Sequence, residues 1–239
     1  MPLTVLLTLA LWQGLVKWGR LPAFILPTPM QVLQRFASSL ADGSLLHNTA
    51  YTLLEVVLGL LAGVVLASVL GYLLARSHLL ERLLAPYLVA SQAVPVVAIA
   101  PLLVIWFGPG MFSKVLICAL IVFFPVLVNT VVGLRAVPEN LRDLMGSLRA
   151  TRPQMLRYLE LPAALPVLLG GLRIGAALSV IGAVVGEFVG SDRGLGFLIN
   201  VGRGQFDTAL VFVAIFTLIA LALGLYGLVV LAEHLLLKE

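Results

Sequence analysis

The side chains that could perform chemistry are few in this 239-residue chain and stand apart from one another. The three histidines, His47, His78 and His234, are widely separated, and no H-E-x-x-H or Ser/His pairing is present to support hydrolysis. Cys118 is the only cysteine, which argues against a disulfide framework and a Cys-based metal cluster. No G-x-x-x-x-G-K-S/T phosphate loop occurs either. We therefore predict a protein that is not an enzyme and that has no catalytic residue, metal site or cofactor.

Two charged side chains, Arg173 and Glu187, lie inside a long apolar run at residues 167–190. A charge within such a segment costs about 3 kcal/mol in a bilayer, which makes it a candidate for function. Fourteen residues separate the two, about 21 Å along a helix, so they cannot neutralise each other. We expect Arg173 to reach the inner interface, and Glu187 either to pair with Arg193 or to line an outer vestibule.

A polar stretch at residues 139–166 interrupts the apolar sequence. Between Pro138 and Pro153 it allows one helix of about fourteen residues. Apolar residues recur there at i, i+3, i+4 and i+7 and predict one stripe, formed by Leu141, Leu144, Met145 and Leu148. Arginines take the complementary side: Arg142, Arg149 and Arg152. After Pro153 we expect a second short turn of helix, which Pro162 and Pro166 end before the next apolar run.

Two interpretations of this stretch stay open. It could be a solvated loop whose arginines only fix the topology of a membrane protein. However, a topological signal needs neither an amphipathic stripe nor paired short helices. The pattern favours a helix that inserts its apolar stripe into a groove on a soluble partner.

The elements that must position these residues are predicted to be membrane-spanning helices in one domain, residues 1–239. Hydrophobic residues make up 61% of the chain, and its mean hydropathy is +1.12. Crossing a bilayer takes about 20 apolar helical residues. Five runs reach that length, at roughly 50–75, 84–107, 111–134, 167–190 and 208–232. With a shorter segment at 2–16, which either spans or lies along the interface, the sequence predicts an all-α membrane protein with about six transmembrane helices.

A further helix is expected between the first two spans. Pro29 can begin it and Gly43 can end it. Val32, Leu33 and Phe36 fall on one face. We predict an interfacial helix outside the membrane, either a packing element or a contact for solute.

Lysine and arginine predict the orientation, because cytoplasmic loops are enriched in them. With six spans and the polar stretch inside, nine of the 15 cations fall on the inner side, five of them within residues 139–173. Both termini are then cytoplasmic. The net charge of +4 follows from this orientation, and we expect lipid but no nucleic acid as a partner.

Several residues could line a path through the membrane. Pro95 and Pro101 remove backbone donors in mid-membrane, and the freed carbonyls must face protein or water. Gln92 and Asn129 add neutral donors and acceptors, although helix packing explains them equally well.

Small residues in the run 167–190 form two rows at four-residue spacing, Gly171, Gly175, Ser179 and Ala183, and Gly182, Gly186 and Gly190. Such rows let helix backbones approach closely. They predict packing within one subunit or at a two-fold axis between two copies. Both arrangements place this helix at the centre, where it could line a shared pore.

The polar stretch resembles the cytoplasmic loop of the membrane subunits of bacterial ATP-binding-cassette (ABC) importers. The pattern there is Glu-Ala-Ala, three residues, Gly, and about a dozen positions to Leu-Pro. Counting back from Leu161 and Pro162 places the Gly position at Arg149, before Ala150, and the Glu-Ala-Ala position at residues 143–145. The glutamate position holds another acid, Asp143, whereas the two alanines and the glycine are replaced by other residues. The likeness covers nearly the whole chain, through LPAALPVLLGGLRIG, VVGEFVG and GLGFLI, and upstream through PTPMQVL and HNTAYTLLEVVLG.

This resemblance implies a type I ABC importer permease that functions as a dimer in the cell (inner) membrane. In that family the loop, here residues 138–162, forms coupling helices in a cleft of a cytoplasmic ATPase dimer, which hydrolyses the ATP. The coupling residues it implies are Asp143, Met145, Leu148, Arg149, Ala150, Leu161 and Pro162. The solute comes from an extracytoplasmic binding protein. The path candidates are Gln92, Pro95, Asn129, Gly182, Gly186 and Glu187.

Within the family, the chain is most similar to permeases of the nitrate, sulfonate and taurine group, in the branch that serves thiamine-pyrimidine or riboflavin uptake. The solute is therefore expected to be a vitamin-related heterocycle, with nitrate, an alkanesulfonate or taurine as alternatives. A secondary transporter or channel is the alternative of another class. It should show inverted repeats or an acidic relay, and neither is apparent.

Overall fold

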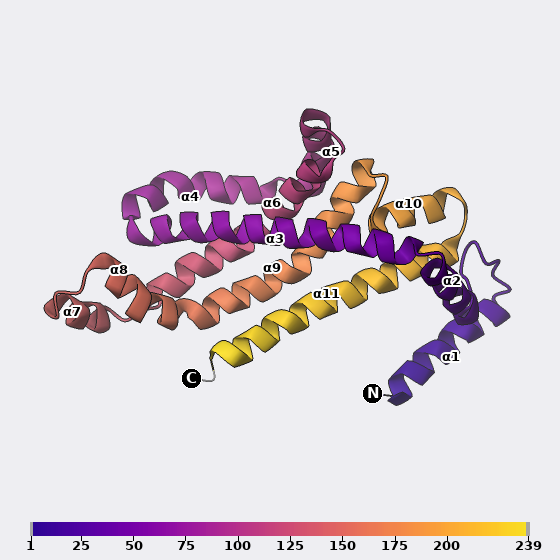
Figure 1. Cartoon of the computed structure of the whole chain (residues 1–239), viewed down its shortest axis with the longest axis horizontal. Helices are drawn as coiled ribbons and strands as arrows, with labels where there is room; N and C mark the ends of the chain where they lie inside the picture. The colour runs from indigo at the N-terminus through magenta and orange to yellow at the C-terminus, as the bar shows by residue number, and fades with distance from the viewer. Residues whose placement is uncertain (1, 238–239) are drawn as a thin grey trace.

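The computed structural model describes residues 2–237, and every element in that range is helical (Figure 1). Four helices are long and apolar enough to cross a membrane. They are α3 (Ser44–Arg76), α6 (Met111–Arg135), α9 (Leu161–Gly190) and α11 (Thr208–Leu236). The structure thereby confirms an all-α membrane protein.

Glycines bring the three central helices α3, α6 and α9 into close contact. A Cβ atom added at Gly59 of α3 would lie 2.1 Å from the Cβ of Cys118 in α6. A Cβ atom added at Gly182 of α9 would lie 2.7 Å from the Cα of the same cysteine. Only glycine permits this approach from both sides. Both small-residue rows of α9 lie in this packing, since Gly171 and Gly186 also contact α6.

The predicted span at 84–107 is wrong as a single helix. It consists of α4 (His78–Ala93) and α5 (Val96–Phe107), which are bent by 93° at the break between them. Pro95 has no backbone N–H, and it disfavours the helical conformation at Val94, which is extended at φ −85° and ψ 115°. Within residues 2–237 there are therefore four candidate spans by length and composition, or five if the bent pair counts as one.

The first two helices agree with expectation in their positions. α1 (Pro2–Trp18) has 17 residues, about the lower limit for a span, so its crossing of the membrane stays a prediction. α2 (Pro29–Ala41) begins after the N-cap Thr28, whose capping box with Gln31 satisfies the first backbone donors. It ends before Gly43, which has a φ of +76°.

The polar stretch is shorter and less regular than predicted. α7 (Glu139–Ser147) has nine residues instead of about fourteen, because Arg149 has a φ of +55°, a left-handed conformation that ends a helix. α8 (Arg152–Met155) is followed by η1 (Leu156–Glu160), a π-helical turn.

Pro162 and Pro166 do not end the helix as expected. η1 continues directly into α9, so that residues 152–190 form one helical stretch. In the π turn the Leu161 N–H bonds to the Leu156 carbonyl oxygen, five residues back. This wider turn leaves room for the ring of Pro162, which would clash in a regular α-helix. Local π adjustments of this kind are how membrane helices tolerate proline.

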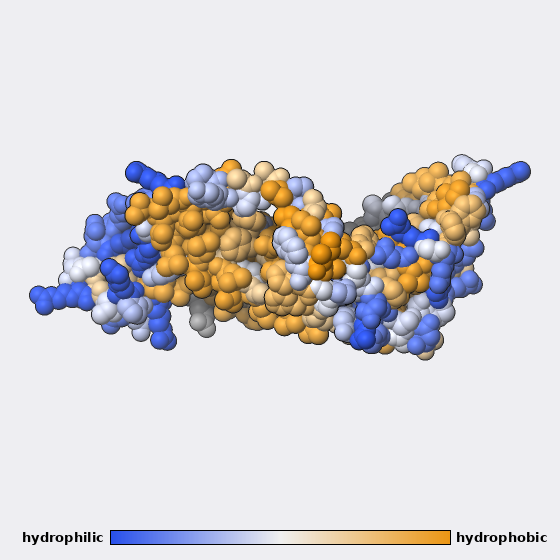
Figure 2. All heavy atoms as spheres, turned by 90° about the horizontal axis from the view of Figure 1, so that it is seen from above, coloured by the Kyte–Doolittle hydropathy of each residue, from blue (hydrophilic) through white to orange (hydrophobic). Residues whose placement is uncertain are grey.

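The polar residues gather at the two ends of the long axis, and the surface between them is largely hydrophobic (Figure 2). We call one of them the α7 end, which carries residues 139–160. The other is the α10 end, which carries α10 (Leu195–Gly204) and α2 (Figure 1). This distribution matches a protein whose middle lies in the hydrocarbon core of a bilayer.

Candidate coupling and pathway sites

α7 exposes the apolar stripe that the sequence predicts. Leu144 is 56% and Leu148 is 69% exposed, Asp143 is exposed, and Met145 is half-buried. None of the residues of α7 is buried. An apolar stripe without a partner in the described chain, on a short helix, has the form needed to dock in a groove.

Arg149 follows α7 in a conformation that glycine favours. Its φ of +55° lies in the left-handed region that side chains other than glycine rarely adopt. This is the position at which the ABC importer pattern has glycine. Ala150 is half-buried, and its N–H donates to the carbonyl oxygen of Met145 at 3.0 Å. Leu161 and Pro162, the other residues of the pattern, are exposed at the start of α9.

A buried carboxylate, Glu160, lies behind α7 and is only 1% exposed. Its Oε2 accepts a hydrogen bond from Nη2 of Arg76 at 2.7 Å, and its Oε1 lies 3.6 Å from Nε of Arg142. Nη2 of Arg142 also donates to the carbonyl oxygen of Leu134 at 2.6 Å. These contacts join α3, α6 and α7 to the start of α9. We call Arg76, Arg142 and Glu160 the clamp; sequence reasoning missed it because no pattern marks Glu160.

Further ion pairs also connect helices outside the clamp. Arg135 of α6 donates to both carboxylate oxygens of Glu81 in α4, at 2.6 and 2.8 Å, and to the carbonyl oxygen of Leu74 at 3.1 Å. Arg173 of α9 pairs with Glu233 of α11. Each of these four charged side chains is partly exposed.

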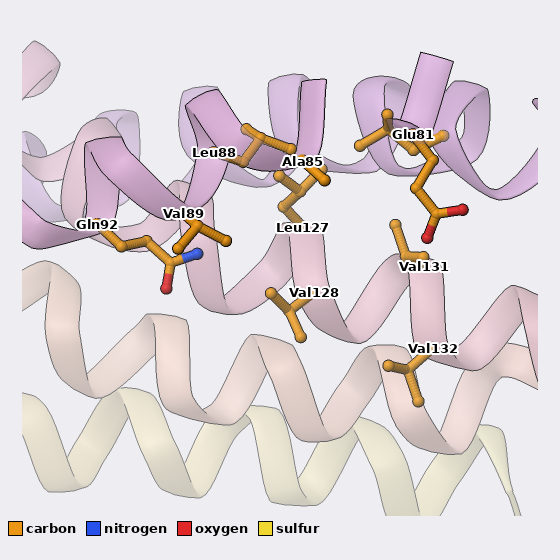
Figure 3. A pocket seen from close by; sticks show the side chains of 10 residues that line it. Glu81, Ala85, Leu88, Val89, Gln92, Leu127, Val128, Val131 and Val132 are labelled. Atoms are coloured by element: carbon orange, nitrogen blue, oxygen red, sulfur yellow. The ribbon is translucent and has the colours of Figure 1, made fainter. Parts of the chain in front are cut away.

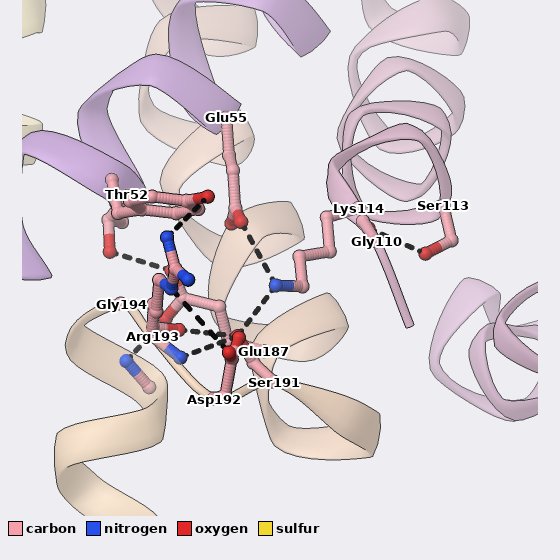
Figure 4. A network of polar contacts seen from close by, with 12 residues as sticks. Thr52, Glu55, Gly110, Ser113, Lys114, Glu187, Ser191, Asp192, Arg193 and Gly194 are labelled. Carbon is pink, nitrogen blue, oxygen red and sulfur yellow. Dashed lines mark hydrogen bonds and ion pairs between the residues drawn. The ribbon is translucent and has the colours of Figure 1, made fainter. Parts of the chain in front are cut away.

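Three charged side chains are buried together nearer the α10 end (Figure 4): Glu55 of α3, Lys114 of α6 and Glu187 of α9. Nζ of Lys114 lies 3.3 Å from Oε1 of Glu55 and donates to Oγ of Ser191 at 2.6 Å. Water does not reach these groups, so each charge must find its partner inside the protein. We call the three residues the buried triad.

Glu187 holds the beginning of α10. Its Oε1 accepts a hydrogen bond from Oγ1 of Thr52 at 2.6 Å, and its Oε2 accepts one from the backbone N–H of Gly196. Oγ1 of Thr52 in turn accepts from the backbone N–H of Leu195 at 2.8 Å. The first N–H groups of a helix lack partners within it, and a carboxylate there is favourable. The triad therefore fixes α10 to α3 and α9.

The expected pairing of Glu187 with Arg193 is wrong. Arg193 lies over the ring of Tyr51 at 5.1 Å, and its Nη1 donates to the Tyr51 hydroxyl at 3.2 Å. The turn after α9 carries this arginine outward, while α10 presents its N–H groups to Glu187. Sequence reasoning placed Lys114 among the outer cations and considered Glu55 only as a residue that could reflect the solute, without a partner. Their positions inside apolar runs were the available signal.

The path candidate Gln92 lines a groove between α4 and α6 (Figure 3). Gln92 stands at one end of the labelled lining and Glu81 at the other. The lining between them is apolar and includes Leu88, Val89, Leu127 and Val128. The groove thus offers mainly apolar surface with one neutral amide.

The remaining candidates are spread over the fold. Pro95 stands at the break between α4 and α5. Asn129 donates to the carbonyl oxygen of Pro125 at 2.8 Å and faces Gly171 of α9. Gly186 packs against Lys114, beside the triad. Within the described chain, Gly182, Gly186 and Glu187 therefore lie together near the contact of α9 with α6, whereas Gln92, Pro95 and Asn129 lie elsewhere.

Comparison with known proteins finds relatives that are all membrane components of transport systems. Residues 56–237 match the family described as binding-protein-dependent transport system inner membrane component. The chain is 50% identical to the riboflavin transport system permease protein RibX of Chloroflexus aurantiacus, over 100% of this chain and 89% of the relative. It is 36% identical to the formylaminopyrimidine transport permease protein ThiX of Halalkalibacterium halodurans, over 97% and 92% of the two chains. It is 32% identical to the taurine transport system permease protein TauC of Escherichia coli, over 93% and 83%.

Proposed function

We propose that this chain, which belongs to the binding-protein-dependent transport system inner membrane components, forms the translocation path for riboflavin. Membership makes it a permease subunit of an ABC importer in the inner membrane. The observation that most supports riboflavin as the solute is the 50% identity to a riboflavin permease across the whole of this chain. A thiamine-precursor pyrimidine is the second candidate, supported by the 36% identical relative. Sulfonates, taurine and nitrate rank below both.

We propose that α7 is the helix that docks on the partner ATPase. Its exposed apolar stripe, with Leu144 and Leu148, suits a groove, and no residue of α7 is buried within this chain. The left-handed conformation of Arg149 supports the match to the importer loop. Asp143, Met145 and Ala150 lie beside this surface, and Leu161 and Pro162 form the start of α9.

This docking role sets the orientation that we propose. The α7 end faces the cytoplasm, where the ATPase resides, and the α10 end faces the binding protein. α1 and α11 both have their chain-internal ends near the α10 end (Figure 1). The amino and carboxyl termini then point toward the cytoplasm.

The path itself is proposed to form between two copies of the chain, which make a homodimer on one ATPase dimer. Gln92 and Pro95 are exposed in the single chain, so they are available to contact solute in the dimer. Gly182, Gly186 and Glu187 are buried against α6 and act by setting the position of α9. Asn129 of α6 packs against Gly171, nearer the start of α9.

The first experiment tests the importer class. The chain is tagged, host membranes are solubilised gently, and copurifying proteins are identified by mass spectrometry. We expect a P-loop ATPase in a fixed one-to-one ratio with the permease. A chain that purifies alone and moves solute without ATP would instead be a secondary carrier.

The second experiment tests the solute. The complex is reconstituted in liposomes with its binding protein, and ATP-driven uptake of labelled riboflavin is compared with that of formylaminopyrimidine and taurine. We expect riboflavin to be taken up best. Preference for either of the other two compounds would contradict the proposed solute but leave the importer class intact.

Two variants test the docking surface. Asp143→Lys and Arg149→Glu reverse exposed charges without touching a buried group. Both variants are expected to insert normally and to lose ATP-driven uptake, because α7 no longer matches its groove. Normal uptake with normal ATP hydrolysis in both would contradict the docking role of α7.

A further inference from the structure

Glu160 occupies an unusual position for a carboxylate. It is the last residue of the π turn η1 and is buried, and this turn is the start of the helical stretch that becomes α9. π turns are rare and occur frequently at functional sites. A buried carboxylate is also retained only where cations compensate it, here Arg76 and Arg142.

The attachment of α7 to the rest of the chain is polar. None of the residues of α7 is fully buried, so apolar packing holds this helix only weakly. Among the described residues, its side-chain attachments to the spans come from Arg142, which contacts Glu160 and the carbonyl oxygen of Leu134. A displacement of α7 therefore acts on the spans through Arg142 as well as through residues 136–138, the short backbone link to α6.

The other half of the clamp extends this connection. Nη2 of Arg76, the last residue of α3, bonds to the second oxygen of Glu160 at 2.7 Å. Glu160 thus stands between the docking helix and two of the three central helices. A shift of its carboxylate changes its contacts with both arginines at once.

We infer that Glu160 is the positioning residue that passes the movement of α7 into α9 and α3. This inference rests on the proposed function, because it takes α7 as the helix that contacts the ATPase. Glu160 does not touch solute or nucleotide. It acts by keeping Arg142 and Arg76 on one buried carboxylate, so that the ends of three helices move together.

The test is Glu160→Gln, which keeps the shape of the side chain and removes its charge. The purified complex with its ATPase is reconstituted in liposomes, with riboflavin as the probe and the binding protein present. Riboflavin moved per ATP hydrolysed is expected to fall on the order of tenfold, a typical size for coupling between sites. Copurification of the ATPase and ATP hydrolysis are expected to persist, which a purely structural role would not predict.

A second variant, Arg142→Gln, addresses the same contact from its partly exposed side and leaves Glu160 paired with Arg76. Its matched control is Arg82→Gln, which removes an exposed arginine of α4 with no ion pair among the described residues. We expect Arg142→Gln to lower riboflavin moved per ATP as Glu160→Gln does. Arg82→Gln should leave that ratio unchanged.

Three results would overturn the inference. An unchanged ratio in Arg142→Gln refutes it, even where Glu160→Gln fails to insert. So does loss of the ATPase from both complexes, which would make the clamp an assembly element. An equal fall in riboflavin moved per ATP in Arg82→Gln would show that the loss of any arginine has this effect. Wild-type chain that binds no ATPase would refute the proposed function itself, which separates the two failures.

Discussion

The two ends of this permease both use buried carboxylates, but they enclose them differently. In the buried triad, Glu55, Lys114 and Glu187 are all almost fully buried, and Glu187 accepts a hydrogen bond from the backbone N–H of Gly196 in α10. In the clamp, Glu160 is buried, but the side chains of Arg76 and Arg142 are about one-third exposed. The triad has two acids and one base, whereas the clamp has one acid and two bases.

This difference indicates different tasks. A charge that is enclosed on all sides cannot exchange its partner for water, so the triad holds α3, α6, α9 and α10 in one arrangement. A half-exposed arginine can exchange a carboxylate for water at low cost. The clamp can therefore rearrange during a transport cycle, while the triad stays fixed.

The largest expected effect comes from breaking the triad. Lys114→Met keeps the length of the side chain and leaves two buried carboxylates without their cation. Breaking a buried pair in this way costs about 3–5 kcal/mol. We expect a marked fall in the Tm of the purified permease in detergent. Lys17→Met, at an exposed lysine of α1, is the control and should leave Tm unchanged. An equal fall in Tm in both variants would show that the triad does not contribute specifically to stability.

A smaller effect is expected from the neighbour that connects the triad to α10. Thr52→Val removes the hydroxyl that donates to Glu187 and accepts from Leu195. Leaving these buried groups unpaired costs about 1–3 kcal/mol, measured again as a fall in Tm. Thr49→Val is the matched control. Among the described residues, the Thr49 hydroxyl donates only to the carbonyl oxygen of Leu45 in the same helix. A Thr49 effect as large as that of Thr52 would argue against a specific role in holding α10.

The α7 end should tolerate, and even gain from, one substitution. Arg149→Gly relieves a left-handed backbone and should stabilise the isolated permease by about 1 kcal/mol. Arg152→Gly, in helical backbone, should instead destabilise it slightly. Thermal unfolding of both variants without the ATPase shows whether each substitution raises or lowers Tm. A lower Tm for Arg149→Gly would contradict the view that the left-handed backbone at Arg149 is strained.

The smallest effect is expected for the exposed pair at the α7 end. Glu81→Gln removes the partner of Arg135, a pair that solvent reaches on both sides. Exposed ion pairs contribute little and are screened by salt. The fall in Tm should be less than that of Thr52→Val and should disappear near about 1 M salt. A large fall in Tm that persists in salt would show that the partly exposed pair stabilises the protein as much as the buried charges do.

Local features of the fold could be predicted from the sequence. Pro29 and Gly43 bound α2 as expected, because a proline at a helix start and a glycine after its end act through their own backbone. The apolar runs located the four long helices for the same reason. Pro95 also acted locally, but its consequence, a bend of 93°, depends on how α4 and α5 pack against their neighbours.

The sites could be predicted only where one segment forms them. The exposed stripe of α7 follows from the spacing of its leucines. In contrast, the partners of Glu187 are Thr52, 135 residues away, and the start of α10. Pairing over that separation depends on the packing of glycines against Cys118, which no periodicity within one helix reveals.

The uninterrupted stretch from residue 152 to residue 190 has a mechanical consequence. Its 39 residues measure about 58 Å along the axis, nearly twice the thickness of the hydrocarbon core. A helix of this length exceeds the apolar layer, with the clamp near one tip and the triad near the other. It can therefore act as a lever anchored at the triad: a tilt of a few degrees displaces the clamp tip by several ångströms while the contacts of the triad stay in place.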